Sequence, residues 1–221
     1  MPFFPLPGLP HLSAHTLFCI GRNYAEHAKE LNNPIPDRPV VFTKPLTTLL
    51  SDGGTVILPH VTSDVHHEVE LVVAIGTGGK NIPVESALNH VAGYAIGLDM
   101  TARDIQTSLK TKSHPWELAK GLDTFAPLGT FVDAASIPDP SNLKLELRVN
   151  GVLRQSGTTA DMLNTIPSLI SFLSSYFTLT PGDLIFTGTP AGVSAVQDGD
   201  KLEAVLGDGL STLTVGVRRD A

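Results

Sequence analysis

The chain has 221 residues and a mass of 23.4 kDa, enough for one large domain that buries its own hydrophobic core. Its 15 basic and 22 acidic side chains leave a formal charge of −7, which argues against a nucleic-acid partner because phosphate contacts require clustered Lys and Arg. Hydrophobic residues make up 42% of the chain and charged residues 17%, a composition that argues against disorder.

Cysteine content and apolar runs narrow the class of protein further. The single cysteine, Cys19, excludes an intrachain disulfide and a cysteine-cluster zinc site, and its apolar neighbours predict a buried small side chain. Every apolar run is far shorter than the ~20 residues that cross a bilayer, so we expect no membrane partner. The proline-rich N-terminal segment lacks the basic region of a signal peptide, and we therefore expect a cytoplasmic protein.

In chain order, frequent glycine and proline between short β-rich runs predict a mainly β architecture with short helices, an α+β class. Residues 1–15 are predicted to form an irregular proline-rich arm and residues 16–221 a single domain, without internal repeats. A strand at 17–20 is followed by a helix that begins near Asn23, which would cap it, and that ends before Pro34.

The rest of the chain alternates between short strands and a few helical segments. Strands are predicted at residues 40–44, 68–75, 93–99, 143–149, 152–155, 184–187, 202–206 and 213–217. Helical segments are predicted at residues 84–90, within 100–111, at 115–120 with proline at the first position, and at 166–176. Asn150-Gly151 predicts a tight hairpin turn.

Two glutamates open the strand expected at residues 68–75, whose apolar continuation is typical of a strand covered on both faces. Because alternate residues of a strand share a face, Glu68 and Glu70 point the same way, and Asp99 ends the next apolar run. If the three converge, each like-charge pair costs about 4 kcal/mol at ~4 Å, and a hard divalent cation would neutralise them. The alternative is a strand that begins in solvent, with Asp99 in a loop elsewhere.

Two histidines precede this acidic pair and could also bind a metal. His67 is expected to point away from the face that carries Glu68 and Glu70. We therefore expect His66 and His67 to support the site rather than to be its ligands.

A histidine and a glutamate share one face of the first predicted helix. Asn23, His27 and Glu30 fall at positions i, i+4 and i+7. Glu30 can accept a hydrogen bond from one imidazole nitrogen of His27, which leaves the other nitrogen free to take a proton from water. The alternative is an ordinary pair on a helix surface.

A glycine-containing turn follows the strand predicted at residues 184–187. In the segment 186–192, glycine lets the backbone approach a ligand, and the N–H groups of Gly188 and Thr189, with the Thr189 hydroxyl, can hold a carboxylate or an oxyanion. The alternative is a tight turn without a ligand.

Taken together, these residues resemble the fumarylacetoacetate hydrolase family, and particularly its small acylpyruvate and fumarylpyruvate hydrolases. The matching stretches occur in the family's order from about residue 17 to the C-terminus: GRNYAEH at 21–27, FTKP at 42–45, HHEVEL at 66–71, LDMTARD at 98–104, PWELAK at 115–120, VNG at 149–151 and TGTPAGV at 187–193.

The resemblance implies a mixed β-sandwich roll of the type of the family's C-terminal domain, assembled as a homodimer. It implies Glu68, Glu70 and Asp99 as ligands of Mg²⁺, with Mn²⁺ or Ca²⁺ as alternatives. It further implies His27 and Glu30 as a catalytic pair, Lys120 as an active-site lysine, and a substrate pocket lined at Arg103, Gln106 and Thr189.

The activity that the resemblance implies is metal-dependent cleavage of a carbon–carbon bond. A 2,4-dioxo acid such as fumarylpyruvate or acetylpyruvate, compounds of aromatic catabolism, would give pyruvate and a carboxylic acid. One alternative is an oxaloacetate decarboxylase or a keto–enol tautomerase or isomerase, which needs no nucleophilic water. The other is a catalytically silent metal-binding domain.

Overall fold

The computed structural model describes residues 4–30 and 34–220, in which short strands outnumber the helices. In chain order the strands are β1 Pro5–Leu6, β2 Leu9–Ser13, β3 Leu17–Gly21, β4 Val40–Lys44, β5 Leu49–Ser51, β6 Thr55–Leu58, β7 Val65–His67, β8 Val69–Ile75, β9 Val91–Leu98, β10 Thr101–Ala102, β11 Ala126–Leu128, β12 Val132–Asp133, β13 Lys144–Val149, β14 Val152–Thr158, β15 Leu184–Phe186, β16 Ser194–Ala195, β17 Lys201–Leu206 and β18 Ser211–Arg219. The α-helices are α1 Ala25–Glu30, α2 Arg103–Thr111, α3 Glu117–Lys120 and α4 Ile166–Tyr176, and Val84–His90 is a 3-10 helix.

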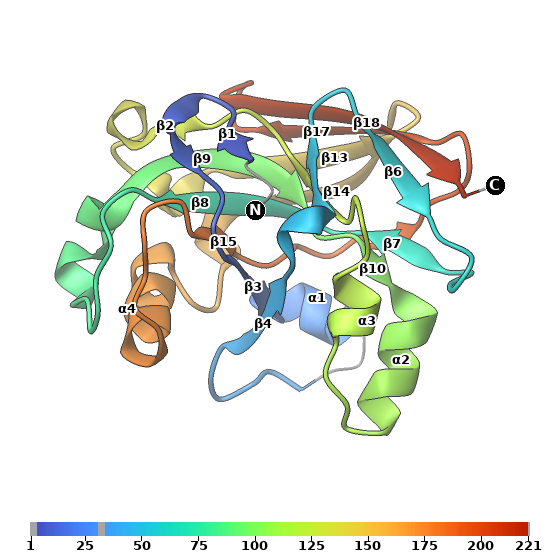
Figure 1. Cartoon of the computed structure of the whole chain (residues 1–221), viewed down its shortest axis with the longest axis horizontal. Helices are drawn as coiled ribbons and strands as arrows, with labels where there is room; N and C mark the ends of the chain where they lie inside the picture. Colours follow the sequence, from blue (N-terminus) through green and yellow to red (C-terminus); the bar gives the residue numbers. More distant parts are fainter. Residues whose placement is uncertain (1–3, 31–33, 221) are drawn as a thin grey trace.

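Two curled sheets pack face to face and form the body of the molecule (Figure 1). The larger sheet has the order β4-β3-β15-β8-β9-β11-β5, with β12 also paired to β9, and β8 and β9 run antiparallel at its centre. The second sheet has the order β14-β13-β17-β18-β6, and β13, β17 and β18 contact β8 and β9. This arrangement is the mixed β-sandwich roll that the family resemblance implies.

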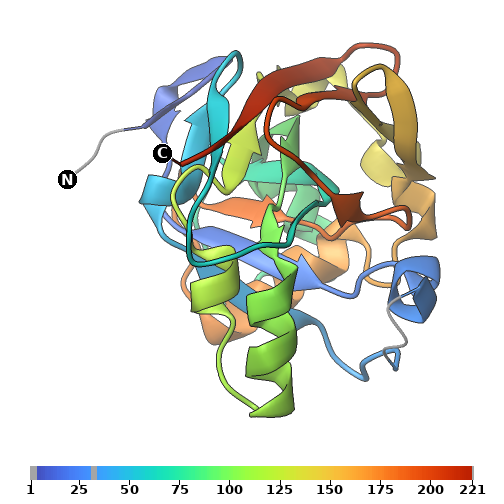
Figure 2. The same cartoon turned by 90° about the vertical axis from the view of Figure 1, so that its right-hand side faces the viewer.

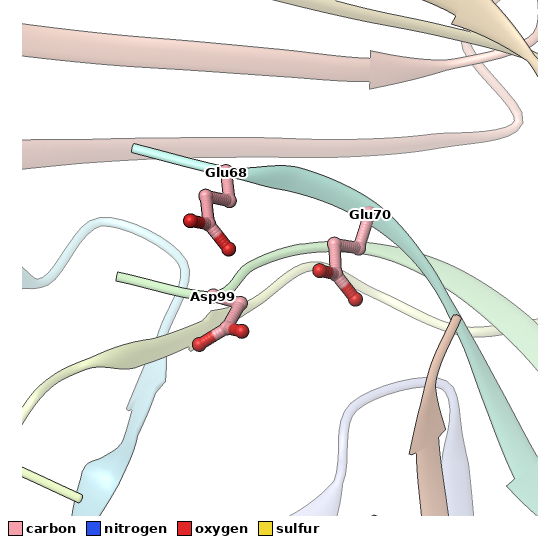
Figure 3. A group of neighbouring side chains, drawn as sticks. All are labelled: Glu68, Glu70 and Asp99. Carbon is pink, nitrogen blue, oxygen red and sulfur yellow. The ribbon is translucent and has the colours of Figure 1, made fainter. Parts of the chain in front are cut away.

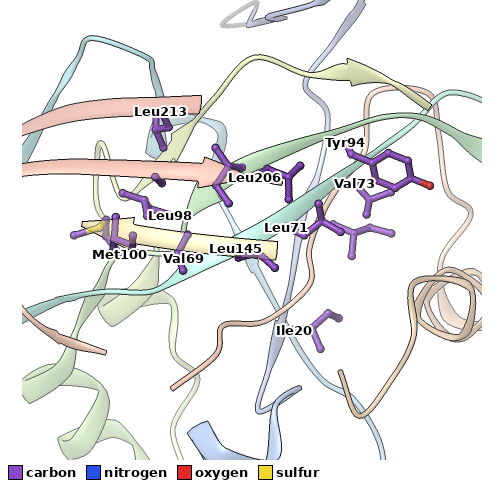
Figure 4. Close-up of a cluster of buried hydrophobic side chains, with 14 of the residues drawn as sticks. Ile20, Val69, Leu71, Val73, Tyr94, Leu98, Met100, Leu145, Leu206 and Leu213 are labelled. Carbon is purple, nitrogen blue, oxygen red and sulfur yellow. The ribbon is translucent and has the colours of Figure 1, made fainter. Parts of the chain in front are cut away.

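Strand β8 is buried along its whole length because both of its faces are covered. On one face Val69, Leu71 and Val73 pack into the main core between the two sheets, which also contains Leu145 and Leu206 (Figure 4). On the other face a second apolar cluster covers the strand. Its continuous apolar sequence therefore has the physical cause expected for a strand that meets no solvent.

The N-terminal segment contributes to this second cluster and is ordered, unlike the irregular arm that its prolines predict. Strands β1 and β2 pair as a hairpin that turns at Gly8, whose φ is +87°. Leu6, Leu9 and Leu12 are buried against the outer face of the larger sheet. Burial of these leucines stabilises the hairpin, and a two-stranded edge tolerates proline because its outer N–H groups have no strand partner. Residues 1–3 of the predicted arm lie outside the described residues.

Every strand predicted from the sequence is present, and the structure adds short strands that the sequence does not predict, namely β5, β6, β7, β10, β11, β12 and β16. Helix α4 has the predicted bounds, and Thr165 caps it by accepting a hydrogen bond from the Ser168 N–H. Residues 101–102 form a short strand before α2, and α3 begins at Glu117 and not with Pro115 as its first residue. Asn150 and Gly151 have φ angles of 51° and 79°, as a tight hairpin turn requires. The predicted end of the first helix before Pro34 falls in residues 31–33, outside the described residues.

Helices α2 and α3 lie at the end of the sandwich where the candidate site is found. Helices α2 and α3 contact each other and project to one side of the sheets (Figure 2). The small sheet β10-β7-β16 lies next to them, where the chain enters β8. Over the described part of the chain, none of the helices has the length and apolar character that crossing a bilayer requires.

Candidate active site

Three carboxylates converge where β7 passes into β8 and where β9 ends (Figure 3). Glu68 and Glu70 project from one face, and pairing of Val69 with Leu98 brings Asp99 beside them. One oxygen from each of the three lies within 4.8 Å of the others, and the side chains are buried. The sequence prediction of convergence is thus confirmed, and the alternative of a solvent-exposed strand start is wrong.

Three cationic side chains surround this acidic trio, which we define as Glu68, Glu70 and Asp99. Lys120 Nζ lies 2.8 Å from Glu68 Oε2 and 2.5 Å from Asp99 Oδ2. Arg103 donates to Glu68 Oε1, and Lys44 Nζ lies 2.5 Å from Asp99 Oδ1. The three cations equal the three carboxylates in number, but they pair only with Glu68 and Asp99.

Lys44 was not singled out from the sequence, although it belongs to one of the stretches shared with the family. Its ammonium group is buried and also donates to the carbonyl oxygens of Met100 and Phe125 at 3.1 and 2.6 Å. A lysine within the apolar strand at residues 40–44 was the available signal, because a buried lysine requires an acidic or carbonyl partner.

The two glutamates have opposite electrostatic surroundings. Burial alone would raise the pKa of Glu68, but the adjacent Lys120 and Arg103 outweigh it and lower that pKa well below its usual range. Burial and the charges of Asp99 and Glu68 raise the pKa of Glu70 well above its usual range. Glu70 accepts one hydrogen bond from the Gly188 N–H at 2.8 Å and has no ion pair among the described residues. Glu70 is therefore the member of the trio with no cationic side chain bonded to it, and its surroundings disfavour its charged form.

This donor set fits a hard divalent cation. The trio offers oxygen atoms only, which Mg²⁺, Mn²⁺ and Ca²⁺ prefer, and a cation between them would stabilise the charged form of Glu70, which has no cationic side chain bonded to it. Nitrogen or sulfur ligands that select zinc are absent from the trio. His67 turns to the opposite side and bonds to Gln155 and Ser194, and His66 bonds to Asp64, so neither joins the trio.

The histidine and glutamate of α1 lie at the same cavity as the trio. His27 Nδ1 is 3.4 Å from Glu30 Oε2, and the Gly192 N–H donates to both oxygens of Glu30 at 3.1 and 3.3 Å. Because Glu30 accepts from Nδ1, the other ring nitrogen of His27 remains free to take a proton. Burial lowers the pKa of His27, so the ring is neutral at neutral pH. His27 is thus a buried cavity residue, and the alternative of a surface pair is wrong for it.

Asn23 has a different role from the helix cap that the sequence predicts. Helix α1 begins two residues later, and the buried Asn23 side chain donates to the carbonyl oxygens of Thr187 and Asn164 at 2.8 and 3.0 Å. Its Oδ1 accepts from the Asn164 N–H. The side chain fixes the start of α1 to two distant loops, and these contacts leave it unable to cap the helix.

The turn at residues 187–192 packs closely against this asparagine. Gly188 has a φ of +98°, and a Cβ there would lie 2.7 Å from Asn23 Cβ, so the position requires glycine. Its N–H is directed to Glu70, which makes it a support of the acidic trio and leaves it unavailable to an oxyanion in this arrangement. Thr189 lines the cavity, as expected.

One cavity joins these groups, and it brings together most of the residues predicted from the sequence. Its walls include His27, Glu68, Glu70, Asp99, Arg103, Gln106, Lys120 and Thr189, and also Arg22, Phe42, Lys110 and Trp116, which sequence reasoning did not assign. Arg103 Nη1 donates to Gln106 Oε1 at 2.6 Å, so the two predicted pocket residues contact each other. The cavity thus combines an oxygen-only cation site, a neutral histidine and cationic side chains on its walls.

Comparisons with known proteins place this cavity in a family of enzymes. The family model for the C-terminal region of fumarylacetoacetate (FAA) hydrolase matches residues 16–218. The chain is 47% identical over 203 residues to the mitochondrial oxaloacetate tautomerase FAHD1 of Arabidopsis thaliana, covering 92% of this chain and 91% of the relative.

Solved structures agree in fold over almost the whole chain. A fumarylpyruvate hydrolase from Pseudomonas aeruginosa in complex with Mn²⁺ and pyruvate has a TM-score of 0.93 at 37% identity and covers 99% of this chain and 96% of its own. A 5-carboxymethyl-2-hydroxymuconate delta-isomerase from Mycobacterium smegmatis has a TM-score of 0.85 at 38% identity, with coverage of 98% and 82%. The chain therefore belongs to the fumarylacetoacetate hydrolase family.

Proposed function

We propose that the protein is a divalent-metal-dependent enzyme acting on 2-oxo dicarboxylic acids with an enolisable C3, and that keto–enol tautomerisation of oxaloacetate is its main reaction. The observation that carries the proposal is the acidic trio and the neutral His27 on the walls of one cavity. The 47% identity to an oxaloacetate tautomerase over 92% of the chain supports the choice of reaction.

The trio would hold Mg²⁺ or Mn²⁺, which when bound polarises the carbonyl of a 2-oxo acid as a Lewis acid. His27 takes the proton from C3 of the keto form and returns it in the reverse direction, with Glu30 orienting the ring. Two contacts of Lys120 are with Glu68 and Asp99, so its third N–H can donate to the enol oxygen or to the substrate carboxylate.

Charge supports a dicarboxylic substrate. The three cations around the trio already balance it, so a divalent cation gives the cavity a net positive charge. Arg22 and Lys110 add positive charge to the cavity wall. Arg22 has a φ of 59°, a backbone conformation that costs energy for a residue other than glycine and that often marks a functional position. A doubly negative substrate would compensate this field.

Hydrolysis of 2,4-dioxo acids is the second candidate, and the His27–Glu30 pair favours it. In that reaction His27 takes a proton from water, which attacks the carbonyl distal to the 2-oxo acid group, and pyruvate and a carboxylic acid are released. Likeness to a fumarylpyruvate hydrolase that binds Mn²⁺ and pyruvate supports this candidate.

Assays with Mg²⁺, Mn²⁺ or EDTA test the proposal. The loss of enol absorbance of oxaloacetate should be faster than in buffer with the same metal, and pyruvate release should be followed in parallel to detect decarboxylation. Acetylpyruvate and fumarylpyruvate test hydrolysis. Faster turnover of acylpyruvates than of oxaloacetate would favour the second candidate, and metal binding without turnover of any of these acids would contradict both candidates in favour of a silent domain.

A single variant tests the preference for dicarboxylic acids. Arg22→Gln should raise KM for fumarylpyruvate about tenfold and leave KM for the monocarboxylic acetylpyruvate nearly unchanged, because one charged contact to the second carboxylate is lost. Equal increases for both substrates would contradict a role for Arg22 in recognising the second carboxylate.

A further inference from the structure

Gln155 lies on β14 of the second sheet and connects it to the candidate active site. Its side chain is 1% exposed and makes four hydrogen bonds. Oε1 accepts from the Val69 N–H at 3.0 Å and from His67 Nδ1 at 2.8 Å. Nε2 donates to Thr189 Oγ1 at 2.8 Å and to the Pro190 carbonyl oxygen at 2.9 Å. One amide thus joins the segment carrying Glu68 and Glu70 to the turn carrying Thr189.

The partners of this amide fix its orientation. The Val69 N–H can only donate and the Pro190 carbonyl can only accept. Exchange of the amide nitrogen and oxygen would place two donors together at Val69 and two acceptors together at Pro190. His67 Nδ1 must then carry a proton, and its Nε2 accepts from the Ser194 hydroxyl at 2.8 Å.

The orientation of the amide determines what the Thr189 hydroxyl can do. Because Thr189 Oγ1 accepts from Gln155, its own proton must find another acceptor. The Pro190 carbonyl is 3.5 Å away, beyond a good O–H···O distance, and already accepts from Gln155. Thr189 lines the active-site cavity, so an anionic substrate group there would accept a hydrogen bond from its hydroxyl.

Close packing holds the turn on β14. A Cβ on Gly157 would lie 2.6 Å from Pro190 Cβ, and a Cβ on Gly192 would lie 2.3 Å from the Arg154 carbonyl oxygen. The same Gly192 N–H holds Glu30. Strand β14 is therefore the surface on which the substrate-facing turn rests.

We propose that Gln155 is a positioning residue that makes the Thr189 hydroxyl a hydrogen-bond donor to the substrate carboxylate. The inference rests on the proposed function, in which an oxo acid occupies this cavity. It assigns to the second sheet a part in substrate recognition through a residue that does not line the cavity.

A double-mutant cycle tests this role. Thr189→Val removes the hydroxyl and should raise KM for oxaloacetate and weaken pyruvate binding, measured by calorimetry with Mn²⁺, about tenfold, with kcat changing less. Gln155→Met should have a similar effect, and the double variant should be no worse than the poorer single variant. Additive effects of the two substitutions would overturn the proposal, because Gln155 would then act independently of Thr189.

Further variants separate positioning from structural support. Gln155→Glu keeps an acceptor for the Val69 N–H and is the variant to use if Gln155→Met does not fold. Its carboxylate would accept the hydrogen bond of the Thr189 hydroxyl, which then no longer points into the cavity, so pyruvate binding should weaken. Thr189→Ser keeps the hydroxyl and should bind pyruvate within about threefold of the parent protein. Ser194→Ala removes the hydroxyl bonded to His67 and should lower stability without changing pyruvate affinity.

Calorimetry also separates this inference from the proposed function. A parent protein that binds pyruvate but turns over none of the oxo acids would refute the proposed function, and the cycle of binding affinities would still test Gln155. Unchanged pyruvate affinity in both Gln155 variants, in protein that turns over oxaloacetate, would refute the inference alone.

Discussion

Glu68 and Glu70 are two residues apart on one face of the chain, yet the tertiary structure stabilises the charged form of Glu68 and destabilises the charged form of Glu70. Lys120 and Arg103 favour the charged form of Glu68 and lower its pKa despite burial. Glu70 has two negative neighbours and one hydrogen bond from Gly188, so burial and repulsion raise its pKa. A site for a cation is thus held by the rest of the fold at a cost in stability, as is common for functional residues.

We expect Glu70→Gln to stabilise the metal-free protein, because the substitution removes a buried carboxyl group whose ionised form is disfavoured by the fold. We expect Glu68→Gln to destabilise it by roughly 3 kcal/mol, because Lys120 and Arg103 lose a partner. Both should weaken binding of Mg²⁺ or Mn²⁺ at least tenfold. Urea unfolding in EDTA and calorimetry measure the two effects. The same sign of stability change for both variants would contradict this description of the trio.

His27→Ala tests whether His27 activates water, as the second candidate function requires. If His27 activates water, the variant should lose hydrolysis of acylpyruvates by about 100-fold or more, whereas metal-dependent decarboxylation of oxaloacetate should be largely retained, because it needs no nucleophile. Initial rates with both substrates at saturating Mg²⁺ measure the effect. Equal loss of both activities would exclude a role limited to water activation.

At the scale of elements, strand β8 positions the two glutamates, and the elements packed on its two faces hold the strand in place. Strand β8 carries the trio's two glutamates at its entry and is covered on one face by the second sheet and on the other by the N-terminal hairpin. The hairpin contributes Leu6 to the apolar cluster beneath the larger sheet. The hairpin therefore stabilises the larger sheet by covering its outer face.

Leu6→Ala should lower the free energy of unfolding by about 2–5 kcal/mol, because Leu6 is 1% exposed and the change leaves a cavity in the cluster. The matched control is Leu153→Ala on β14, where the side chain is 43% exposed and the change should be within about 0.5 kcal/mol. Chemical denaturation of both variants measures the difference. A change at Leu6 as small as that at Leu153 would contradict a packed hairpin.

At the scale of the whole molecule, the candidate active site lies where several separate parts of the chain meet. Helix α1 supplies His27, the larger sheet supplies the trio, helices α2 and α3 supply Arg103 and Lys120, and the turn at residues 187–192 supplies Thr189. Such a site is assembled only in the folded state, which makes folding and the ionisation of its buried groups interdependent.

Two buried histidines, His27 and His67, and the half-buried His66 give the molecule an acid-side dependence of stability. Burial lowers the pKa values of His27, His66 and His67 below 6.5, so the unfolded chain binds more protons than the folded one as the pH falls through this value. The free energy of unfolding should therefore decrease from pH 7.5 to pH 5.5 and level off below the folded-state pKa values.

Measurement in the Glu70→Gln variant without metal removes the opposite contribution of Glu70, whose raised pKa makes the folded state bind the extra proton. Urea unfolding at a series of pH values gives the slope. His11→Gln, at an exposed position in the hairpin, is the control and should leave the slope unchanged. A stability that rises as the pH falls over this range would contradict burial of neutral histidines.

The sequence by itself determined the positions of α4 and of half of the described strands, including β8, β9, β13, β17 and β18, because hydrophobic alternation, turn residues and proline act over a few residues. It also determined the oxygen-only character of the trio, since two alternating glutamates at the entry of an apolar strand share one face. The resemblance of several ordered stretches identified the family.

Only the tertiary structure decided what each local pattern is used for. Asn23 has the residue type of a helix cap, but contacts with Thr187 and Asn164, more than 140 positions away, direct its side chain elsewhere. The bonds that orient Gln155 and the buried Lys44 also join residues far apart in the chain. Local propensities cannot specify such partners, because burial and hydrogen bonding between distant segments are settled only when the two sheets pack together.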